Sequence, residues 1–301
     1  MLALLLSCTD STNTGPSEPA TCLDPLPAYE GCIATMESVD ADEGYLSYAE
    51  RWAFDSAGNP VRGLVDQYGD GVYEVEYLQT WDGDGHLLRS ARGAPGEEPD
   101  MTLTQTWTDG LLVTQEEHWA DGSGDYRVDY AYDGIEVARK ESDNDLDGAV
   151  DVVSTYTWES GRMVGELQDN GADGTVDAIC EITWTVAGDG ASSTQTCVYL
   201  EIDFGFTILT VYDAHDAVLS VTKDSDGDGV VDEEDTWTRD DRCLVVADEH
   251  VEYGILEPYV TGSAYTYDEG GRLVRDDAYA RRDSGGDLSS TTTTTWTYTC
   301  P

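Results

Sequence analysis

An aromatic residue recurs along the chain at intervals of 25 to 30 residues. The residue before it is always Ala, Thr or Val, and the residue after it is always Asp, Glu or Thr. A second aromatic often lies two positions earlier, which places both rings on one face of an extended strand. We name these residues the anchors and expect them to pack in the core of a sheet. The anchors are Phe54, Trp81, Trp107, Tyr132, Trp158, Trp184, Tyr212, Trp237, Tyr267 and Trp296.

A short turn follows many anchors, and a second apolar strand follows the turn. Asp133-Gly134 is a typical two-residue hairpin turn, and Leu87-Leu88 and Leu244-Val245 lie in second strands. Each repeat is therefore a hairpin, and the pattern predicts an all-β chain, an antiparallel meander of about ten strand-turn-strand repeats. So wide a meander normally curls, closes or splits. We expect a curled or spiral sheet, with a β-propeller of two repeats per blade as the alternative.

The segment Tyr265 to Leu273, Tyr-Thr-Tyr-Asp-Glu-Gly-Gly-Arg-Leu, carries a more specific signature. It resembles the YD repeat of the Rhs family, as does Ala131-Tyr132-Asp133-Gly134. The Gly-Arg pair is kept only at Gly161-Arg162 and Gly271-Arg272, and Trp replaces Tyr at many anchors. The resemblance implies a β-sheet spiral of the kind that encloses a toxic domain in Rhs proteins. It makes an Rhs-like role in toxin handling or intercellular competition a second functional hypothesis.

Two acidic loops carry the most specific chemistry. In each, acids at positions 1, 3, 5 and 9 surround a Gly at position 6, which is the spacing that converges oxygen ligands on one calcium ion. The loops resemble the calcium loops of thrombospondin type 3 repeats and dockerins. The alternative is that their acids only cap backbone amides of hairpin turns. The candidate ligands are Asp224, Asp226, Asp228, Val230 through its carbonyl, Asp232 and Asp235, and in the second loop Asp143, Asp145, Asp147 and Asp151.

Three further segments keep acids at positions 1, 5 and 9 of the same pattern: 169–177, 66–74 and 121–129. They lack the acid at position 3. For these segments we favour capped turns without metal.

The chain is strongly acidic, with 62 Asp and Glu against 15 Lys and Arg and a net charge of -47. Such a surface repels nucleic acid and anionic membrane and attracts cations or a partner with a cationic surface. The 8 Trp and 18 Tyr favour a folded protein over a disordered acidic tail. We therefore expect a protein or glycan partner, no nucleic acid, and membrane contact only through a lipid anchor.

The N-terminus reads as an export signal. The apolar run from Leu2 to Leu6 ends in Ser7-Cys8, which resembles the lipobox of bacterial lipoproteins and implies lipidation of Cys8. We assign 1–8 to the signal remnant, 9–40 to a Ser/Thr/Pro-rich tether and 41–301 to the hairpin domain. The expected location is the bacterial outer membrane, facing the periplasm or the surface.

Six cysteines remain: Cys22, Cys32, Cys180, Cys197, Cys243 and Cys300. An even number in an exported protein indicates disulfides. Cys180 and Cys197 flank a Gly-Asp-Gly turn and could face each other across a hairpin. The preferred pairs are Cys22 with Cys32, Cys180 with Cys197, and Cys243 with Cys300.

No common catalytic or nucleotide-binding motif is present, and the four histidines, His86, His118, His215 and His250, read as turn or surface residues. We therefore predict a structural or adhesion module of the cell envelope and no enzymatic activity. An envelope hydrolase with an unrecognised site is the third hypothesis.

Overall fold

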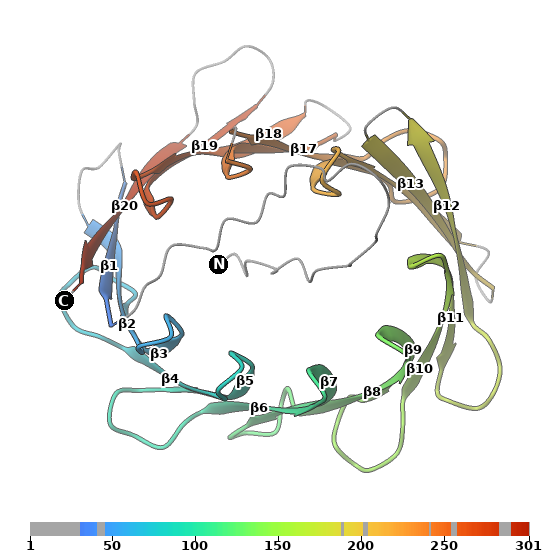
Figure 1. Cartoon of the computed structure of the whole chain (residues 1–301), viewed down its shortest axis with the longest axis horizontal. Helices are drawn as coiled ribbons and strands as arrows, with labels where there is room; N and C mark the ends of the chain where they lie inside the picture. The colour runs from blue at the N-terminus through green and yellow to red at the C-terminus, as the bar shows by residue number, and fades with distance from the viewer. Residues whose placement is uncertain are drawn as a thin grey trace.

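The chain forms one closed barrel of 20 antiparallel strands in sequence order (Figure 1). The structure, a computed structural model, describes residues 31–40, 46–187, 190–200, 204–240, 242–253, 258–282 and 290–300. The strands are β1 Ile33–Asp40, β2 Leu46–Phe54, β3 Pro60–Asp66, β4 Val75–Trp81, β5 Leu87–Gly93, β6 Met101–Thr108, β7 Leu111–Trp119, β8 Tyr126–Asp133, β9 Glu136–Asp143, β10 Val152–Glu159, β11 Arg162–Asn170, β12 Ala178–Ala187, β13 Gly190–Tyr199, β14 Phe204–Tyr212, β15 Val218–Asp224, β16 Glu233–Arg239, β17 Val245–Glu252, β18 Tyr259–Tyr267, β19 Leu273–Arg282 and β20 Ser290–Thr299.

Closure corrects the predicted architecture. The all-β meander is confirmed, but the expected spiral sheet and the propeller alternative are both wrong, because β1 pairs with β20 from Ile33 opposite Thr299 to Asp40 opposite Thr292. An open meander would leave the backbone groups of its two outer strands unpaired. Pairing the first strand with the last removes both edges. The sequence pattern of each hairpin is the same in an open and in a closed sheet, so it could not distinguish them.

The anchors lie on the inner face of the barrel. Figure 1 shows that the short turns, such as the one between β4 and β5, bend into the barrel. His86 in that turn stacks on the anchor Trp107, with ring centroids 4.4 Å apart. Side chains that stack across neighbouring strands lie on the same face of the sheet. Because the turn that contains His86 bends inward, the face that carries Trp107 and the other anchors is the interior one.

Most anchors tie one hairpin to the preceding one through a polar atom. The Trp81 indole N–H donates to the Pro60 carbonyl at 2.7 Å, and Trp158 donates to Val137 at 2.8 Å. The same bond joins Trp107 to Leu87, Tyr132 to Leu112, Trp184 to Met163 and Tyr267 to Val245. This explains why Trp and Tyr, which carry a donor, outnumber Phe at these positions.

The last repeat departs from the predicted anchor. The expected residue was Trp296, but the Tyr298 hydroxyl makes the bond, donating to the Leu273 carbonyl at 2.8 Å. Arg272 lies over the Tyr298 ring at 5.1 Å, as Arg162 lies over Trp184 at 4.6 Å. The retained Gly-Arg pairs therefore place a cation on the next inner aromatic ring.

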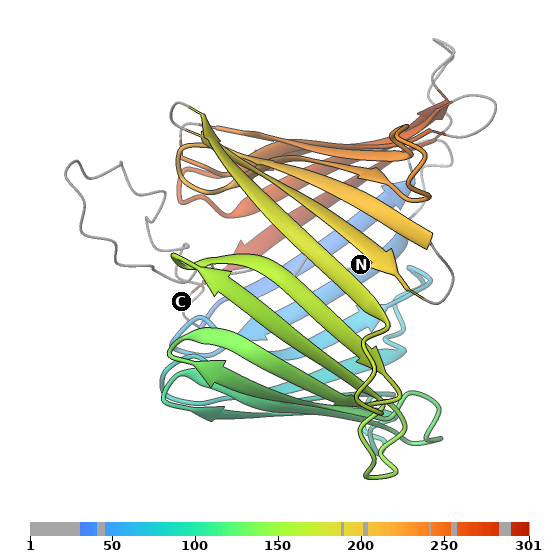
Figure 2. The same cartoon turned by 90° about the vertical axis from the view of Figure 1, so that its right-hand side faces the viewer.

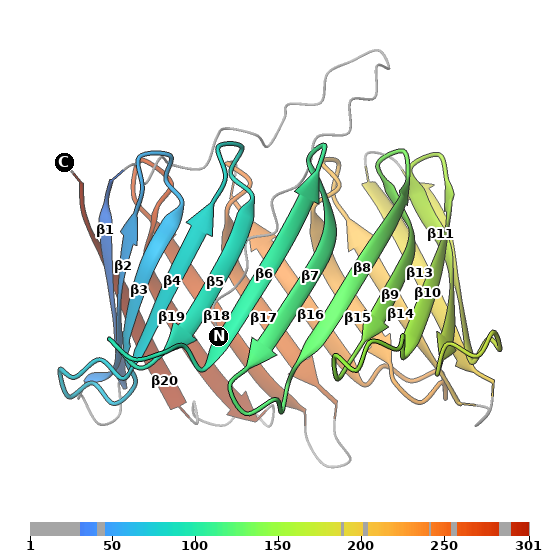
Figure 3. The same ribbon diagram turned by 90° about the horizontal axis from the view of Figure 1, so that it is seen from below.

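Strand order separates two kinds of connection at the two ends of the barrel (Figure 3). The turns from β2 to β3, β4 to β5 and so on lie at one end, which we name the turn end. The acidic loops from β3 to β4, β9 to β10, β11 to β12 and β15 to β16 lie at the other, the loop end. Figure 2 shows the strands crossing the wall obliquely, as barrel closure requires.

The disulfides confirm one predicted pair and overturn the other two. Cys180 bonds Cys197 across β12 and β13. Cys32 bonds Cys300 instead of Cys22, because closure brings the start of β1 beside the end of β20. Cys243 is also disulfide-bonded, and the predicted Cys243–Cys300 pair is wrong because Cys300 is taken.

Residues 1–30, including Cys8 and Cys22, lie outside the described residues. The segment assigned to a tether ends in strand β1, Ile33–Asp40. Over the ranges that the structure describes, no helix is long and apolar enough to cross a membrane.

Candidate functional site

Four loops at the loop end share one backbone geometry. In each, the carboxylate at position 1 accepts the amide of the Gly at position 6, and the acid at position 9 accepts the amide of position 2. In one loop these bonds run from Gly148 to Asp143 at 2.9 Å and from Asn144 to Asp151 at 2.7 Å. The loops are 66–74, 143–151, 169–177 and 224–232.

Backbone dihedrals repeat in the same way. Positions 4 and 6 have positive φ in all four loops, for example 57° at Leu146 and 89° at Gly148. Position 6 is Gly in every copy, with φ between 88° and 90°, a region that residues with a Cβ rarely adopt. Two of the three segments that we assigned to simple turns, 66–74 and 169–177, therefore have the fold of the two full loops.

The structure brings some of the predicted metal ligands together. Asp143, Asp145 and Asp151 place carboxylate oxygens within 4.8 Å of one another, and Asp224, Asp226 and Asp232 do the same. Asp147 and Asp228 instead accept the amides of Ala149 and Val230 at 2.7 Å.

One predicted ligand lies elsewhere. Asp235 is part of β16, and its carboxylate contacts His250 Nδ1 at 2.8 Å. Strand β16 begins at Glu233. Asp235, which the calcium pattern places in the loop, therefore belongs to the barrel wall.

The loops differ in whether both carboxylate oxygens of the first acid accept hydrogen bonds. Asp224 accepts the Gly227 amide on Oδ1 and the Gly229 amide on Oδ2. Asp66, which is 2% exposed, also has partners on both oxygens. Asp143 is 9% exposed, and its Oδ1 is buried without a hydrogen-bond partner. A buried, unpaired carboxylate oxygen is costly, so the Asp143 loop is the incomplete one.

One further cluster was missed by sequence reasoning. Asp66, Asp70 and Glu74 also gather within 4.8 Å, although Tyr68 replaces the acid at position 3. The shared spacing of positions 1, 5 and 9 was the available signal. In the remaining segment, 121–129, Asp129 lies in β8 and pairs with Arg127 at 2.8 Å, so no equivalent cluster forms.

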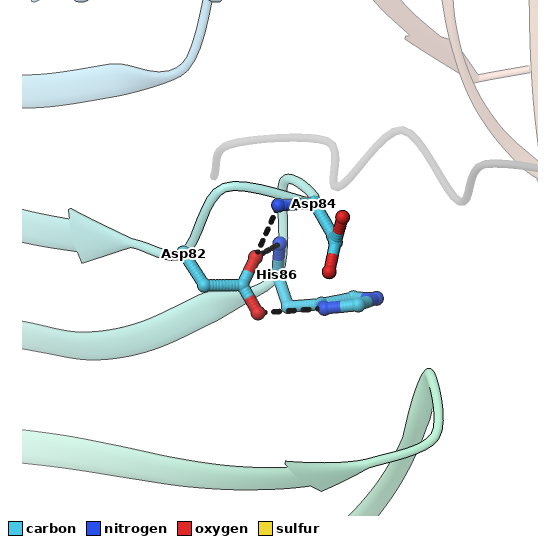
Figure 4. A group of neighbouring side chains, drawn as sticks. All are labelled: Asp82, Asp84 and His86. Atoms are coloured by element: carbon cyan, nitrogen blue, oxygen red, sulfur yellow. Dashed lines mark hydrogen bonds and ion pairs between the residues drawn. The ribbon is translucent and has the colours of Figure 1, made fainter.

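A different acidic cluster occupies the turn end. Figure 4 shows Asp82, Asp84 and His86 in the β4–β5 turn. Asp82 Oδ1 accepts the amides of Asp84 and His86, both at 2.9 Å, and Oδ2 contacts His86 Nδ1 at 2.9 Å. The hydrogen bond from the His86 amide, followed by the one from its side chain, holds the pKa of Asp82 below its usual range. Because both oxygens are in use, we read this carboxylate as a turn cap.

An apolar groove lies beside two of the loops, on the face of β9 to β11 opposite the anchors, because Val153 and Thr155 alternate along β10 with the anchor Trp158. It has a volume of about 450 Å³. Its floor contains Val153 and Leu167, and its loop end contains Val150 and Val176. Leu167 is 41% exposed. The cross-strand partners Ile179 and Val198 continue this aliphatic row along β12 and β13.

Charged side chains surround the groove. Arg139 and Glu141 line it and pair with each other at 2.7 Å. Asp169, near the end of β11, lines it as the first acid of the loop 169–177. With Arg139 neutralised by Glu141, the neighbouring loop acids give this apolar surface a negative rim.

The outer face elsewhere carries exposed ion pairs. Arg62 pairs with Glu76 at 2.6 Å across β3 and β4, and Arg275 pairs with Asp277 at 2.7 Å on β19. The wall of a barrel in lipid instead presents a continuous apolar band, where charged side chains are destabilising.

Comparison with known proteins finds no matching family model and no matching curated sequence. Among solved structures, a porin-like protein from Bacteroides uniformis is 11% identical, with 91% of this chain and 100% of that chain covered and a TM-score of 0.39. The Photorhabdus luminescens Tc holotoxin pore is 12% identical over 82% of this chain and 16% of that chain, with a TM-score of 0.27. The TcdB2-TccC3 structure is 13% identical over 86% and 20%, with a TM-score of 0.17. Likenesses this low identify neither a family nor a function.

Proposed function

We propose that the protein is an exported, non-catalytic binding barrel of the bacterial cell envelope, anchored by a lipid on Cys8. It holds a cationic, amphipathic segment of a partner protein in the groove between the loops 143–151 and 169–177. The observation that carries this proposal is the groove itself, an exposed aliphatic floor with an acidic rim.

The chemistry of the groove selects the partner. Apolar side chains of a bound segment would cover Leu167 and Val153, which removes aliphatic surface from water. Lys or Arg side chains of the same segment would meet the loop acids. The net charge of -47 would also accelerate the approach of a cationic partner.

Two features support export. Disulfides persist in oxidising compartments outside the cytoplasm, and this chain has Cys32–Cys300 and Cys180–Cys197. The ion pairs of the outer face favour a barrel that stands in water and reaches the membrane only through its anchor.

The test uses the mature, disulfide-bonded chain and a fluorescent peptide of alternating Leu and Lys. The expected result is saturable binding in fluorescence polarisation that weakens as salt is added. Leu167→Ser should weaken binding about tenfold, since burying a leucine side chain contributes roughly 1.5 kcal/mol.

Leu78→Ser is the matched control, because Leu78 is an exposed leucine, 47% accessible, on β4. It should leave the affinity unchanged. Equal losses in the two variants would rule out the groove, and equal binding of a Leu and Glu peptide would rule out a cationic partner.

A further inference from the structure

We infer that the loop Asp143–Asp151 is a calcium site, with the carboxylates of Asp143, Asp145 and Asp151 as its protein ligands. The loop borders the proposed partner groove through Val150, but the inference rests on the loop acids alone and does not depend on the groove. The argument rests on the cluster and on one buried oxygen within it.

The buried oxygen is the observation that points to a ligand. Asp143 is nine-tenths buried, its Oδ2 accepts the Gly148 amide, and its Oδ1 has no hydrogen-bond partner. Leaving such an atom unpaired costs more than an ordinary hydrogen bond contributes, so a buried carboxylate oxygen normally has a donor or a metal.

Among the described residues, no cation donates a hydrogen bond to this oxygen. Arg127 is the residue opposite Asp143 across β8 and β9. Its Nε and Nη2 atoms bond Asp129 at 2.8 and 2.9 Å, and its Nη1 approaches Glu116 at 3.8 Å. Arg127 contributes a favourable field at Asp143 but no direct bond.

The ligand set selects the metal. Asp145 and Asp151 bring their carboxylates within 4.8 Å of Asp143, so the donors are three acidic oxygens with no nitrogen or sulfur. Hard oxygen donors in a flexible loop suit Ca²⁺, whereas Mg²⁺ requires a tighter octahedron and keeps more of its water. Asp145 is exposed, which leaves room for water to complete the coordination. We expect a dissociation constant on the order of 10⁻⁴ to 10⁻³ M, as in extracellular modules.

Comparison with the other loops identifies this one as the strongest. Asp169 and Asp224 hold the same first position, but each has an amide donor on both oxygens. Of these four loops, therefore, only 143–151 has a first acid with a buried oxygen that accepts no hydrogen bond.

The experiment is a calcium titration of the mature, disulfide-bonded chain by isothermal calorimetry, in buffer of physiological ionic strength. The matched variants are Asp143→Asn and Asp169→Asn, which change the net charge equally and keep an oxygen to accept the Gly amide. We expect wild type and Asp169→Asn to bind calcium alike and Asp143→Asn to bind at least tenfold more weakly. Equal binding by all three proteins would overturn the site, because it would reduce calcium binding to the general charge.

A second variant, Asp145→Asn, tests the site if Asp143→Asn does not fold. Asp145→Asn changes an exposed side chain whose one hydrogen bond, to the Asp147 amide, an asparagine oxygen can keep. It should also weaken calcium binding about tenfold, and unchanged binding would again exclude the site. Leu167→Ser, which changes the groove floor and none of the loop acids, should bind calcium as wild type does, so the calcium site and the partner groove fail separately.

Discussion

The two ends of the barrel use the same residues, Asp and Gly, with different results. At the turn end, the five-residue turn 82–86 fills both oxygens of its first acid from its own amides and imidazole. The turn 268–272 does so with the Arg272 amide and guanidinium. At the loop end, the nine-residue loop 143–151 leaves Asp143 Oδ1 buried and unpaired. Both short turns fill the first acid completely, whereas of the four longer loops 143–151 leaves one oxygen of its first acid without a donor.

The comparison separates stability from binding. The turn end also carries the Cys32–Cys300 disulfide and the aromatic side-chain bonds, so it fastens the barrel. The loop end carries the acid clusters and the groove, so it has the chemistry for ligands. We therefore expect turn-end changes to alter the free energy of unfolding and loop-end changes to alter the response to calcium.

The largest expected effect is on barrel closure at the turn end. Replacing Cys32 and Cys300 together by Ala should lower the free energy of unfolding by about 5 kcal/mol, because this disulfide spans 268 residues of chain. The same change at Cys180 and Cys197, which span 17 residues, should cost about 3 kcal/mol. Urea unfolding of both double variants measures the difference. If the Cys180 and Cys197 variant lost more stability than the Cys32 and Cys300 variant, the disulfide at the turn end would not be the one that stabilises the barrel most.

The next effect concerns the aromatic side-chain bonds. Trp158→Phe keeps a ring at the anchor but removes the N–H that donates to Val137, which should cost about 1 to 3 kcal/mol. Thr157→Ala, at the exposed neighbouring position, should change stability by less than about 0.5 kcal/mol. Urea unfolding of the two variants checks this. Equal values would mean that the polar atom of the anchor does not stabilise the barrel.

Calcium should sharpen the contrast between the ends. With about 10 mM calcium and a dissociation constant of about 1 mM, linkage predicts roughly 1.4 kcal/mol of stabilisation, a rise in Tm of about 3 °C. Asp143→Asn should lose this rise, and Asp82→Asn should keep it although its turn also clusters acids. Thermal melts in calcium and in EDTA give the answer. A rise that Asp82→Asn abolished would reverse the roles of the two ends.

The hairpin repeat was predictable because its signals are local. Spacing of the anchors, turn residues and alternation all act within one repeat, and the same is true of the Cys180–Cys197 pair. Closure was not predictable, since pairing β1 with β20 joins residues more than 250 positions apart and leaves no periodic trace. The wrong partners predicted for Cys32 and Cys300 follow from the failure to predict closure.

The candidate site was predictable in part for the same reason. Acid spacing identified the loops, but the choice between Asp143 and Asp224 depends on which amides reach which oxygen. The groove was missed because its floor, Val153 and Leu167, belongs to different hairpin strands whose outer faces meet only in the folded wall.

The smallest expected effect compares two acids of the last hairpin as pH changes. Burial, with the nearby charge of Asp248, raises the pKa of Asp276 above its ordinary 3.8. Burial also acts on Asp268, but the hydrogen bonds from Arg272 outweigh it and lower the pKa of Asp268. A raised pKa means that the folded state holds the proton more tightly, so the stability from Asp276 is complete below pH 3.8 and is lost as pH rises through its folded pKa.

Asp276→Asn should therefore raise stability at pH 7, by less than about 1 kcal/mol because the group is only half buried, and the gain should vanish below about pH 4. Asp268 has the opposite sign, since its contribution is present above pH 3.8 and is lost as pH falls through its folded pKa. Asp268→Asn should thus lower stability at pH 7 and have less effect in acid. Urea unfolding at both pH values tests the pair. If both variants were less stable than wild type at pH 7, Asp276 would be stabilised by a partner, as the capping acids of the turn end are. The distinction between a capping acid such as Asp268 and a buried wall acid such as Asp276 would then be wrong.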